Sequence, residues 1–156
     1  MDNKIKTKQE IEQIAKELKQ KGKTIVTCNG CFDILHPGHT KFLTEAKQQG
    51  DILIVGLNSD ESVKENKGSQ RPINNENNRA QILAALETVD YITIFNEKTP
   101  IKLLEMIKPN IHANGSEYGE NCLEAETVKK YGGKIHIIKL KEGFSTTDII
   151  QRIKVL

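Results

Sequence analysis

The chain has 156 residues, a formal net charge of +2, and a charged fraction of 28%, which is typical of a globular domain. This length allows one ordinary domain and not two, so we expect a single domain over residues 1–156. The small net charge argues against a nucleic-acid coat, and no apolar run approaches the roughly 20 residues that span a membrane. The polar segment Met1–Lys8 lacks the apolar core of a secretory signal. We therefore expect a cytoplasmic protein that binds neither nucleic acid nor membrane.

Helical and strand patterns alternate along the chain. Thr7 and Glu10 have the spacing of a capping box, and apolar residues follow at helical intervals. They predict a helix over residues 8–21, within an N-terminal segment 1–22 that packs on the domain. The further predicted elements, in chain order, are a strand over 23–28, a helix over 37–50, a strand over 51–58, a polar connection over 59–75, a helix over 76–87, a strand over 90–95, a helix over 100–108, a strand over 111–114, a helix over 123–131, a strand over 134–140 and a last helix opened by a second capping box, Ser145–Asp148.

This alternation of strands and helices predicts an α/β fold. The expected architecture is a single Rossmann-like, doubly wound domain with a five-stranded parallel sheet flanked by helices. The run over residues 51–58 is almost entirely apolar, as in strands that are covered on both faces. Ligands of such sheets bind beyond the carboxyl ends of the strands. The residues that directly follow the strands are therefore the candidates for function.

The strongest candidate is the stretch Thr27–His39, which runs from the end of the first predicted strand to the start of a helix. A helix N-terminus suits phosphate, and Gly30 and Gly38 permit a close backbone approach. His36 and His39 are three residues apart, so both rings can face one point and donate hydrogen bonds to charge that develops on a phosphorus atom. The alternative interpretation is that both histidines are polar caps of the helix.

The same stretch also has the composition of a metal or redox site. Cys28 and Cys31 precede His36 and His39, but only four residues separate the two pairs, whereas structural zinc modules usually have about a dozen there. A thioredoxin-like pair normally opens a helix, and the residues between these cysteines favour a turn instead. With Cys122, the chain has an odd number of cysteines, which favours free thiols. Zinc and redox chemistry remain the weaker alternatives.

Four cations form a second candidate group. Lys64, Lys67 and Arg71 lie in the predicted connection after the second strand, and Arg79 lies near the start of the next helix. Such a group can hold a polyphosphate or a phosphorylated substrate. A solvated basic loop is the alternative interpretation.

Two further turns follow the late strands. Ser145, Thr146 and Thr147 open the last helix, where hydroxyl and free N–H groups can bind phosphates in addition to capping. Gly115 and Tyr118, in Asn114–Tyr118, can approach and contact a flat base. An ordinary turn explains the latter segment equally well.

Together these motifs resemble the cytidylyltransferase-like nucleotidyltransferase superfamily. Its mark, His-x-Gly-His after the first strand, is His36-Pro37-Gly38-His39 here. The chain is most similar to the branch of adenylyltransferase domains that act on D-glycero-β-D-manno-heptose 1-phosphate. The stretches that carry this resemblance are Asn29–His39, Val55–Lys64, Lys67–Asn74 and Gly143–Thr147.

The resemblance implies an activity and a set of roles. The chain would transfer AMP from ATP to a sugar 1-phosphate, giving an ADP-sugar and pyrophosphate, with Mg²⁺ held mainly by the phosphates. A separate sugar kinase would supply the substrate, and relatives are often homodimers. The implied catalytic residues are His36, His39, Lys64 and Arg79. The implied nucleotide-binding residues are Asn29, Gly30, Phe32, His36, His39, Gly115, Tyr118, Ser145, Thr146 and Thr147, and the substrate phosphate is implied to contact Lys64, Lys67 and Arg71.

Two departures from the family patterns bear on specificity. Glycerol-3-phosphate cytidylyltransferases have an arginine where this chain has Leu140 followed by Lys141, which argues for ATP over CTP. The heptose enzymes usually have a lysine where this chain has Asn114, which leaves the identity of the sugar undetermined. The alternatives are a cytidylyltransferase for glycerol 3-phosphate or another sugar or polyol phosphate, and a nucleotide-binding regulatory module without catalysis.

Overall fold

The computed structural model describes residues 2–139 and 143–156. The helices are η1 (Asp2–Lys4), α1 (Lys8–Gln20), α2 (Pro37–Lys47), α3 (Asp60–Lys67), α4 (Glu76–Ala84), α5 (Ile101–Ile107), α6 (Ala125–Lys130) and α7 (Thr146–Lys154). The strands are β1 (Ile25–Gly30), β2 (Ile52–Asn58), β3 (Tyr91–Phe95), β4 (Ile111–Gly115) and β5 (Lys134–Ile138).

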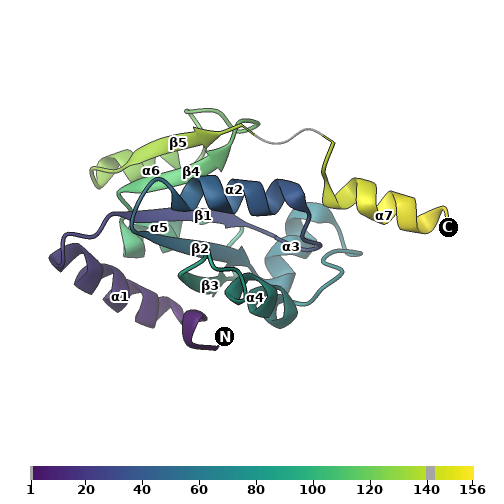
Figure 1. Cartoon of the computed structure of the whole chain (residues 1–156), viewed down its shortest axis with the longest axis horizontal. Coiled ribbons are helices and arrows are strands. Elements are labelled where there is room, and N and C mark those ends of the chain that lie inside the picture. The colour runs from purple at the N-terminus through teal and green to yellow at the C-terminus, as the bar shows by residue number, and fades with distance from the viewer. Residues whose placement is uncertain (1, 140–142) are drawn as a thin grey trace.

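The five strands form one parallel sheet in the order β3-β2-β1-β4-β5 (Figure 1). The register runs from Ile25 opposite Ile52 to Gly30 opposite Leu57, so β1 and β2 end at the same level. The strand order reverses between β1 and β4, which is the position where doubly wound sheets bind ligands. The predicted α/β fold with five parallel strands is confirmed.

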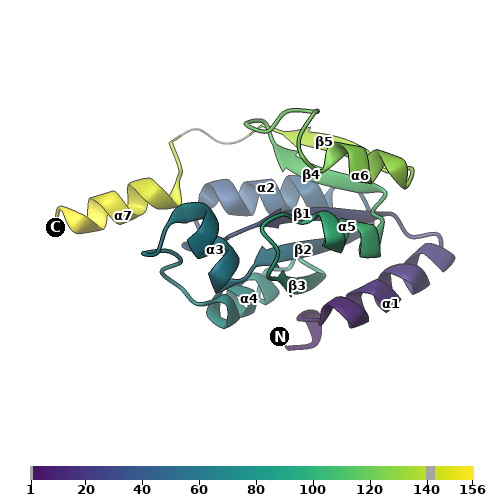
Figure 2. The ribbon, with the colours of Figure 1, turned by 180° about the vertical axis from the view of Figure 1, so that it is seen from behind.

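Helices cover both faces of the sheet, which explains why the strands are apolar throughout. Successive strand residues point to opposite faces, so Val26 packs in the core beneath α2 and α4, while Ile25 packs in the core beneath α1 and α5. Figures 1 and 2 show these two layers from opposite sides, with α2 in front of β1 in one view and α5 in front of it in the other.

The N-terminal helix packs on the domain as the sequence predicts. The Thr7 side chain accepts from the Glu10 N–H, and the Glu10 carboxylate accepts from the Thr7 N–H at 2.8 Å, which completes the predicted capping box. Ile11 and Ala15 are buried together with Leu103 and Ile107 of α5. Thus α1 covers the α5 side of the sheet.

Several predicted boundaries differ from the structure. The polar connection predicted over residues 59–75 contains helix α3, which the Ser59 side chain caps by accepting from the Ser62 N–H. The pattern was missed because Ser62 and Val63 are the only buried residues of a very polar helix. Strand β1 begins and ends two residues later than predicted, so that Asn29 and Gly30 belong to the strand. The predicted end of the last strand at Leu140 lies outside the described residues.

The predicted boundaries of several helices are too wide. The predicted helices over residues 76–87 and 123–131 are Glu76–Ala84 and Ala125–Lys130 in the structure. In the part of the chain that the structure describes, no helix is long and apolar enough to cross a membrane.

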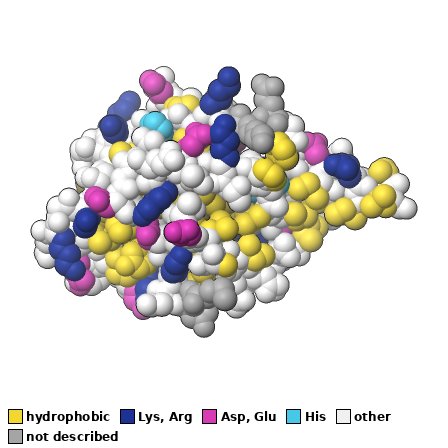
Figure 3. Space-filling model, viewed as in Figure 1, with side chains coloured by type: hydrophobic (Ala, Val, Ile, Leu, Met, Phe, Trp, Pro, Cys, Tyr) yellow, Lys and Arg dark blue, Asp and Glu magenta, His cyan; other side chains and the backbone are white. Residues whose placement is uncertain are grey.

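Helix α7 differs from the other helices in how little of it is covered. It projects away from the sheet (Figures 1 and 2), and none of its residues, Thr146–Lys154, is buried. Hydrophobic side chains gather along it and continue onto the adjoining body (Figure 3). Its first turn nevertheless lies against the β1–α2 turn, because the Thr146 hydroxyl donates to the Ile34 carbonyl at 3.3 Å.

Candidate active site

A pocket of about 580 Å³ lies at the carboxyl ends of the strands, on both sides of the β1–β4 switch point. Five parts of the chain that are distant in sequence contribute to it. They are the β1–α2 turn, the segment around α3, the β3–α5 connection, the end of β4 with the segment that follows it, and the first turn of α7. All ten residues predicted to bind nucleotide line this pocket: Asn29, Gly30, Phe32, His36, His39, Gly115, Tyr118, Ser145, Thr146 and Thr147.

The two histidines predicted to be catalytic lie together in the pocket. The rings of His36, the N-cap residue of α2, and His39, in its first turn, stack with centroids 3.8 Å apart and an interplanar angle of 22°. Pro37 and Gly38 between them start the helix and bring His39 back beside His36. Two parallel imidazoles at this distance can act on one phosphate group.

The surroundings of both imidazoles favour the neutral form. Burial, together with the neighbouring His36 ring, lowers the pKa of His39 to about 4, and burial lowers the pKa of His36. The Nδ1 atoms of both rings are buried and have no hydrogen-bond partner among the described residues. Nε2 is therefore the nitrogen through which each ring can reach a ligand, and a neutral ring protonated there donates one hydrogen bond.

Close packing fixes the orientation of the His36 ring. A Cβ atom built on Gly38 would lie 2.9 Å from His36 Nδ1, so any larger residue at this position would require the His36 ring to shift. Phe32 packs near the second ring, with its ring centroid 5.3 Å from that of His39. Its φ of 44° is an uncommon conformation for a bulky residue, and such strain is often found at functional sites.

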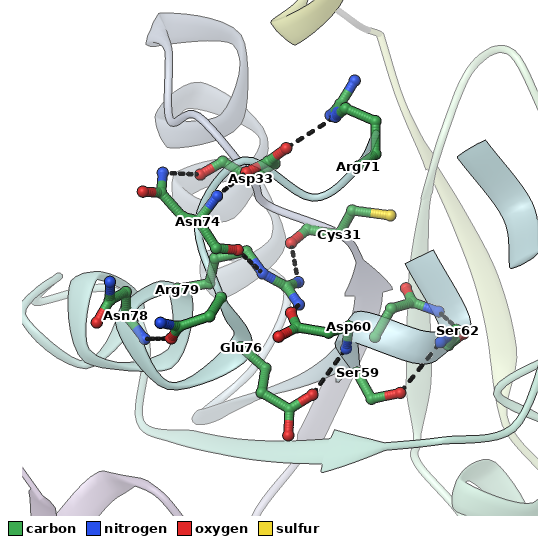
Figure 4. Close-up of polar contacts among 12 residues, drawn as sticks. Cys31, Asp33, Ser59, Asp60, Ser62, Arg71, Asn74, Glu76, Asn78 and Arg79 are labelled. Carbon is green, nitrogen blue, oxygen red and sulfur yellow. Dashed lines mark hydrogen bonds and ion pairs between the residues drawn. The ribbon is translucent and has the colours of Figure 1, made fainter. Parts of the chain in front are cut away.

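The structure brings together only two of the four predicted cations. Lys67 and Arg71 line the pocket, while Lys64 and Arg79 do not. Lys64 is exposed on the last turn of α3. Arg79 is fully buried, and its guanidinium donates to three oxygens (Figure 4): Cys31 O at 2.6 Å, Asp60 Oδ1 at 2.8 Å and Asn74 O at 2.9 Å. In this arrangement Arg79 holds three segments together and does not reach the pocket.

The first turn of α7 forms another side of the pocket. Ser145 caps this helix by accepting from the Asp148 N–H at 3.0 Å, as predicted. The rings of His36 and Phe144, the residue before the cap, are 6.4 Å apart. The first-turn N–H groups of a helix are not used within the helix, so this end of α7 can bind an anion near the histidines.

A buried polar cluster supports the end of β4. The Asn114 amide donates to the buried Glu124 carboxylate at 3.2 Å, and both residues line the pocket. On the same strand, His112 Nδ1 lies 2.8 Å from the Thr27 hydroxyl, and burial lowers the His112 pKa to about 4 while Glu124 opposes that shift. Asn114 thus contacts a buried carboxylate at the wall of the pocket.

The cysteines do not form a metal site in the structure. Cys28 is buried within β1, and burial raises the pKa of its thiol to about 12. Cys31 lines the pocket, with its pKa raised by burial. Over residues 2–139 and 143–156, no three His, Cys, Asp or Glu side chains are grouped so as to hold a metal ion.

Sequence reasoning missed several pocket residues. Lys98 and Thr99 follow β3, so the same rule that selected residues after the other strands would have found them. Asn66 was missed because α3 was not predicted. Glu124 carries no sequence signal, since it precedes a helix as many surface glutamates do.

Residues 27–152 match the family model described as Cytidylyltransferase-like. The chain belongs to this family. The matched segment includes the stacked histidines, the basic residues of the pocket and the first turn of α7. All five parts of the pocket lie within the matched residues.

Curated relatives extend the similarity over almost the whole chain. The chain is 49% identical over 150 residues to the Bifunctional protein HldE of Aliarcobacter butzleri. It is 48% identical over 153 residues to the Bifunctional protein HldE of Campylobacter jejuni subsp. doylei. These alignments cover 96% and 98% of this chain but only 31% and 32% of the relatives. The chain thus spans about a third of their length.

Solved structures agree with the fold. A lipopolysaccharide core biosynthesis protein from Thermoplasma volcanium has a TM-score of 0.62 at 34% identity, covering 77% of this chain and 98% of that one. A pantoate-beta-alanine ligase from Francisella tularensis has a TM-score of 0.66 at 22% identity, covering 97% of this chain and 77% of that one, and supports the fold alone. As a member of the cytidylyltransferase-like family with these relatives, the chain is a nucleotidyltransferase.

Proposed function

We propose that the chain is an adenylyltransferase that transfers AMP from ATP to a sugar 1-phosphate, D-glycero-β-D-manno-heptose 1-phosphate, releasing pyrophosphate. The observation that carries this proposal is the stacked pair of neutral imidazoles at the switch point of the sheet. The name of the Thermoplasma structure, a lipopolysaccharide core biosynthesis protein, is consistent with a sugar substrate. The choice of ATP rests on the sequence at Leu140 and Lys141, which lie outside the described residues.

The reaction is a single in-line displacement. An oxygen of the sugar phosphate forms a bond to the α-phosphorus of ATP, and the bond from that phosphorus to the β-phosphate bridging oxygen breaks, so that pyrophosphate leaves with its electron pair. Negative charge grows on the oxygens around the α-phosphorus. His36 and His39 each donate one hydrogen bond to this charge through Nε2, as donors that are already oriented before the ligand binds.

The other pocket residues bind the phosphates at the two ends of this displacement. We assign the leaving pyrophosphate to the first turn of α7 and the attacking sugar phosphate to Lys67 and Arg71. Lys98, at the end of β3, supplies a further positive charge.

The pocket is consistent with Mg²⁺ that arrives bound to the triphosphate. Three acidic residues line it, Asp33, Glu117 and Glu124; of these, Asp33 accepts from three donors and Glu124 accepts from Asn114. Mg²⁺ would neutralise phosphate charge and assist the leaving group. We further propose that a sugar kinase supplies the substrate.

Turnover assays test the proposed function directly. The chain is incubated with ATP or CTP and with heptose 1-phosphate, glucose 1-phosphate or glycerol 3-phosphate, and pyrophosphate is measured while the product is identified by mass. ATP with the heptose phosphate should give the highest kcat/KM. A preference for CTP with glycerol 3-phosphate would replace the proposal with the cytidylyltransferase alternative.

The His39→Ala variant separates an enzyme from a binding module. We expect kcat to fall by about 10²-fold or more, while the Kd for ATP changes little, because the ring acts on charge that forms only in the transition state. Unchanged turnover would show that the assignment of the histidines is wrong.

A further inference from the structure

Asp33, in the β1–α2 turn, is a buried carboxylate at the centre of a hydrogen-bond network (Figure 4). It accepts from Arg71 Nε at 2.8 Å, from the Ile73 N–H at 2.9 Å and from the Asn74 N–H at 2.8 Å. The Asn74 side-chain amide also donates to the Asp33 carbonyl at 3.0 Å. These contacts bind the segment 71–74 to the turn that carries the catalytic histidines.

The contact with Nε fixes the plane of the Arg71 guanidinium without using its outer nitrogens. The Asp33 side chain is 0% exposed, while the Arg71 side chain is 16% exposed and lines the pocket. In Figure 4 the outer end of the guanidinium points away from Asp33. An arginine held at Nε can still present its two terminal NH₂ groups to a phosphate as a fork.

The second arginine of this network shows the opposite arrangement. Arg79 and Asp60 are also 2.8 Å apart, but here the arginine side chain is 0% exposed and the carboxylate is 30% exposed. That pair buries its cation, whereas the Asp33–Arg71 pair buries its anion and leaves the cation at the pocket. The two pairs therefore share a distance but differ in the nitrogen used, which is Nε in Arg71 and a terminal Nη in Arg79, and in which partner is buried.

We propose that Asp33 is a positioning residue that orients Arg71 toward the phosphate of the acceptor substrate. The proposal rests on the proposed function for the identity of that substrate. Asp33 acts through Arg71 and does not touch the ligand, because its carboxylate is occupied by the donors of residues 71, 73 and 74. Without the carboxylate, the arginine would have to order its own side chain on binding, at a cost in affinity.

The first test observes the ligand-free protein and needs no turnover. In ¹⁵N-labelled protein, the Arg71 Nε–H should give a slowly exchanging side-chain resonance that disappears in Asp33→Asn. The matched control is Asp60→Asn, which should leave the Arg71 resonance unchanged. If the Arg71 Nε–H exchanges as fast as that of an exposed arginine in the wild type, the proposal is overturned.

The second test measures coupling by calorimetry, with inorganic phosphate as the probe for the acceptor phosphate and with pyrophosphate present to occupy the first turn of α7. Asp33→Asn and Arg71→Ala should each weaken phosphate binding about tenfold, and the double variant should be no weaker than Arg71→Ala alone within about twofold. Asp60→Asn should bind like the wild type. A purely structural role for Asp33 predicts effects that multiply in the double variant, and that result overturns the proposal.

A third variant covers the case in which Asp33→Asn does not fold. Arg71→Lys keeps the charge and leaves Asp33 its two backbone donors, but one ammonium cannot both pair with Asp33 and present a fork to a phosphate. It should lose about as much affinity for inorganic phosphate as Arg71→Ala, and wild-type affinity in Arg71→Lys overturns the proposal.

Turnover separates this inference from the proposed function. As a single substitution, Asp33→Asn should raise the KM for the sugar phosphate about tenfold. The kcat and the KM for ATP should each change by less than threefold. If phosphate binding shows the coupling but no sugar phosphate is turned over, the inference stands and the proposed function fails. If the sugar phosphate is turned over but Asp33 and Arg71 show no coupling, the proposed function stands and the inference fails.

Discussion

The Cα of Gly38 lies so close to the imidazole of His36 that a methyl group there would come within 2.9 Å of His36 Nδ1 and 3.0 Å of Cε1. Because Gly38 is in the first turn of α2 with an ordinary φ, its backbone would accept alanine. The constraint at this position therefore concerns the orientation of the His36 ring, and not the fold of the helix.

Replacing Gly38 with alanine should separate stability from activity. We expect the melting temperature to stay the same or rise, because alanine favours the helix by up to about 1 kcal/mol over glycine. Turnover should fall at least about tenfold, because the His36 ring must move away from His39. Thermal unfolding and steady-state kinetics on the same preparation check this, and a fully active Gly38→Ala enzyme would contradict it.

The depressed pKa of His39 predicts an unusual pH–rate profile. Its pKa is lowered to about 4 by burial and by His36, so the ring stays neutral as the pH falls from 7 to 5. The acid limb of kcat/KM should therefore lie well below the ordinary histidine pKa of about 6.5, provided circular dichroism shows the protein folded. An NMR titration of the His39 ring gives the same quantity directly, and a midpoint near 6.5 would contradict the prediction.

Asn114 is expected to stabilise the fold through Glu124. Asn114→Ala removes the amide that donates to this buried carboxylate, and we expect a loss of about 1–3 kcal/mol in the free energy of unfolding. Adding Glu124→Gln should recover part of this loss, because an amide is less costly to bury than a carboxylate. Urea denaturation of the single and double variants measures both effects, and simple additivity would argue against a direct interaction.

Arg79 distinguishes a structural from a catalytic cation. Arg79→Met leaves the carboxylate of Asp60 and two backbone carbonyls without their donor, and we expect a loss of about 3–5 kcal/mol in stability. The exposed Arg152, replaced in the same way, should change stability by less than about 0.5 kcal/mol. A stable but inactive Arg79→Met protein would instead indicate that Arg79 has a catalytic role.

The fold was predictable because its main signals are local and mutually consistent. The apolar run of β2 and the capping box of α1 each predict the observed element, and Pro37 correctly marks the start of α2. Helix α3 was not predictable from a helical spacing of apolar residues, because only two of its residues are buried. Its N-cap, Ser59, is also polar. Element ends were less certain because caps and fraying shift them by a few residues.

The candidate site was predictable where residues follow strands directly, as with the histidines and Ser145. It was less predictable where partners come from elsewhere in the chain. A sequence shows that Arg71 and Arg79 are both basic, but not that Asp33 presents one to the pocket while Asp60 and two carbonyls hold the other inside. That distinction depends on burial, which only the folded chain decides.

Helix α7 places Ser145–Thr147 at the pocket although none of its own residues is buried. Its attachment to the rest of the molecule at that end includes one hydroxyl–carbonyl contact, from Thr146 to Ile34. With the triphosphate bound at the first turn of α7, as proposed, docking of this helix and binding of the triphosphate would be thermodynamically linked, so that each favours the other. A protease that cuts within α7 should therefore act more slowly when the triphosphate is present.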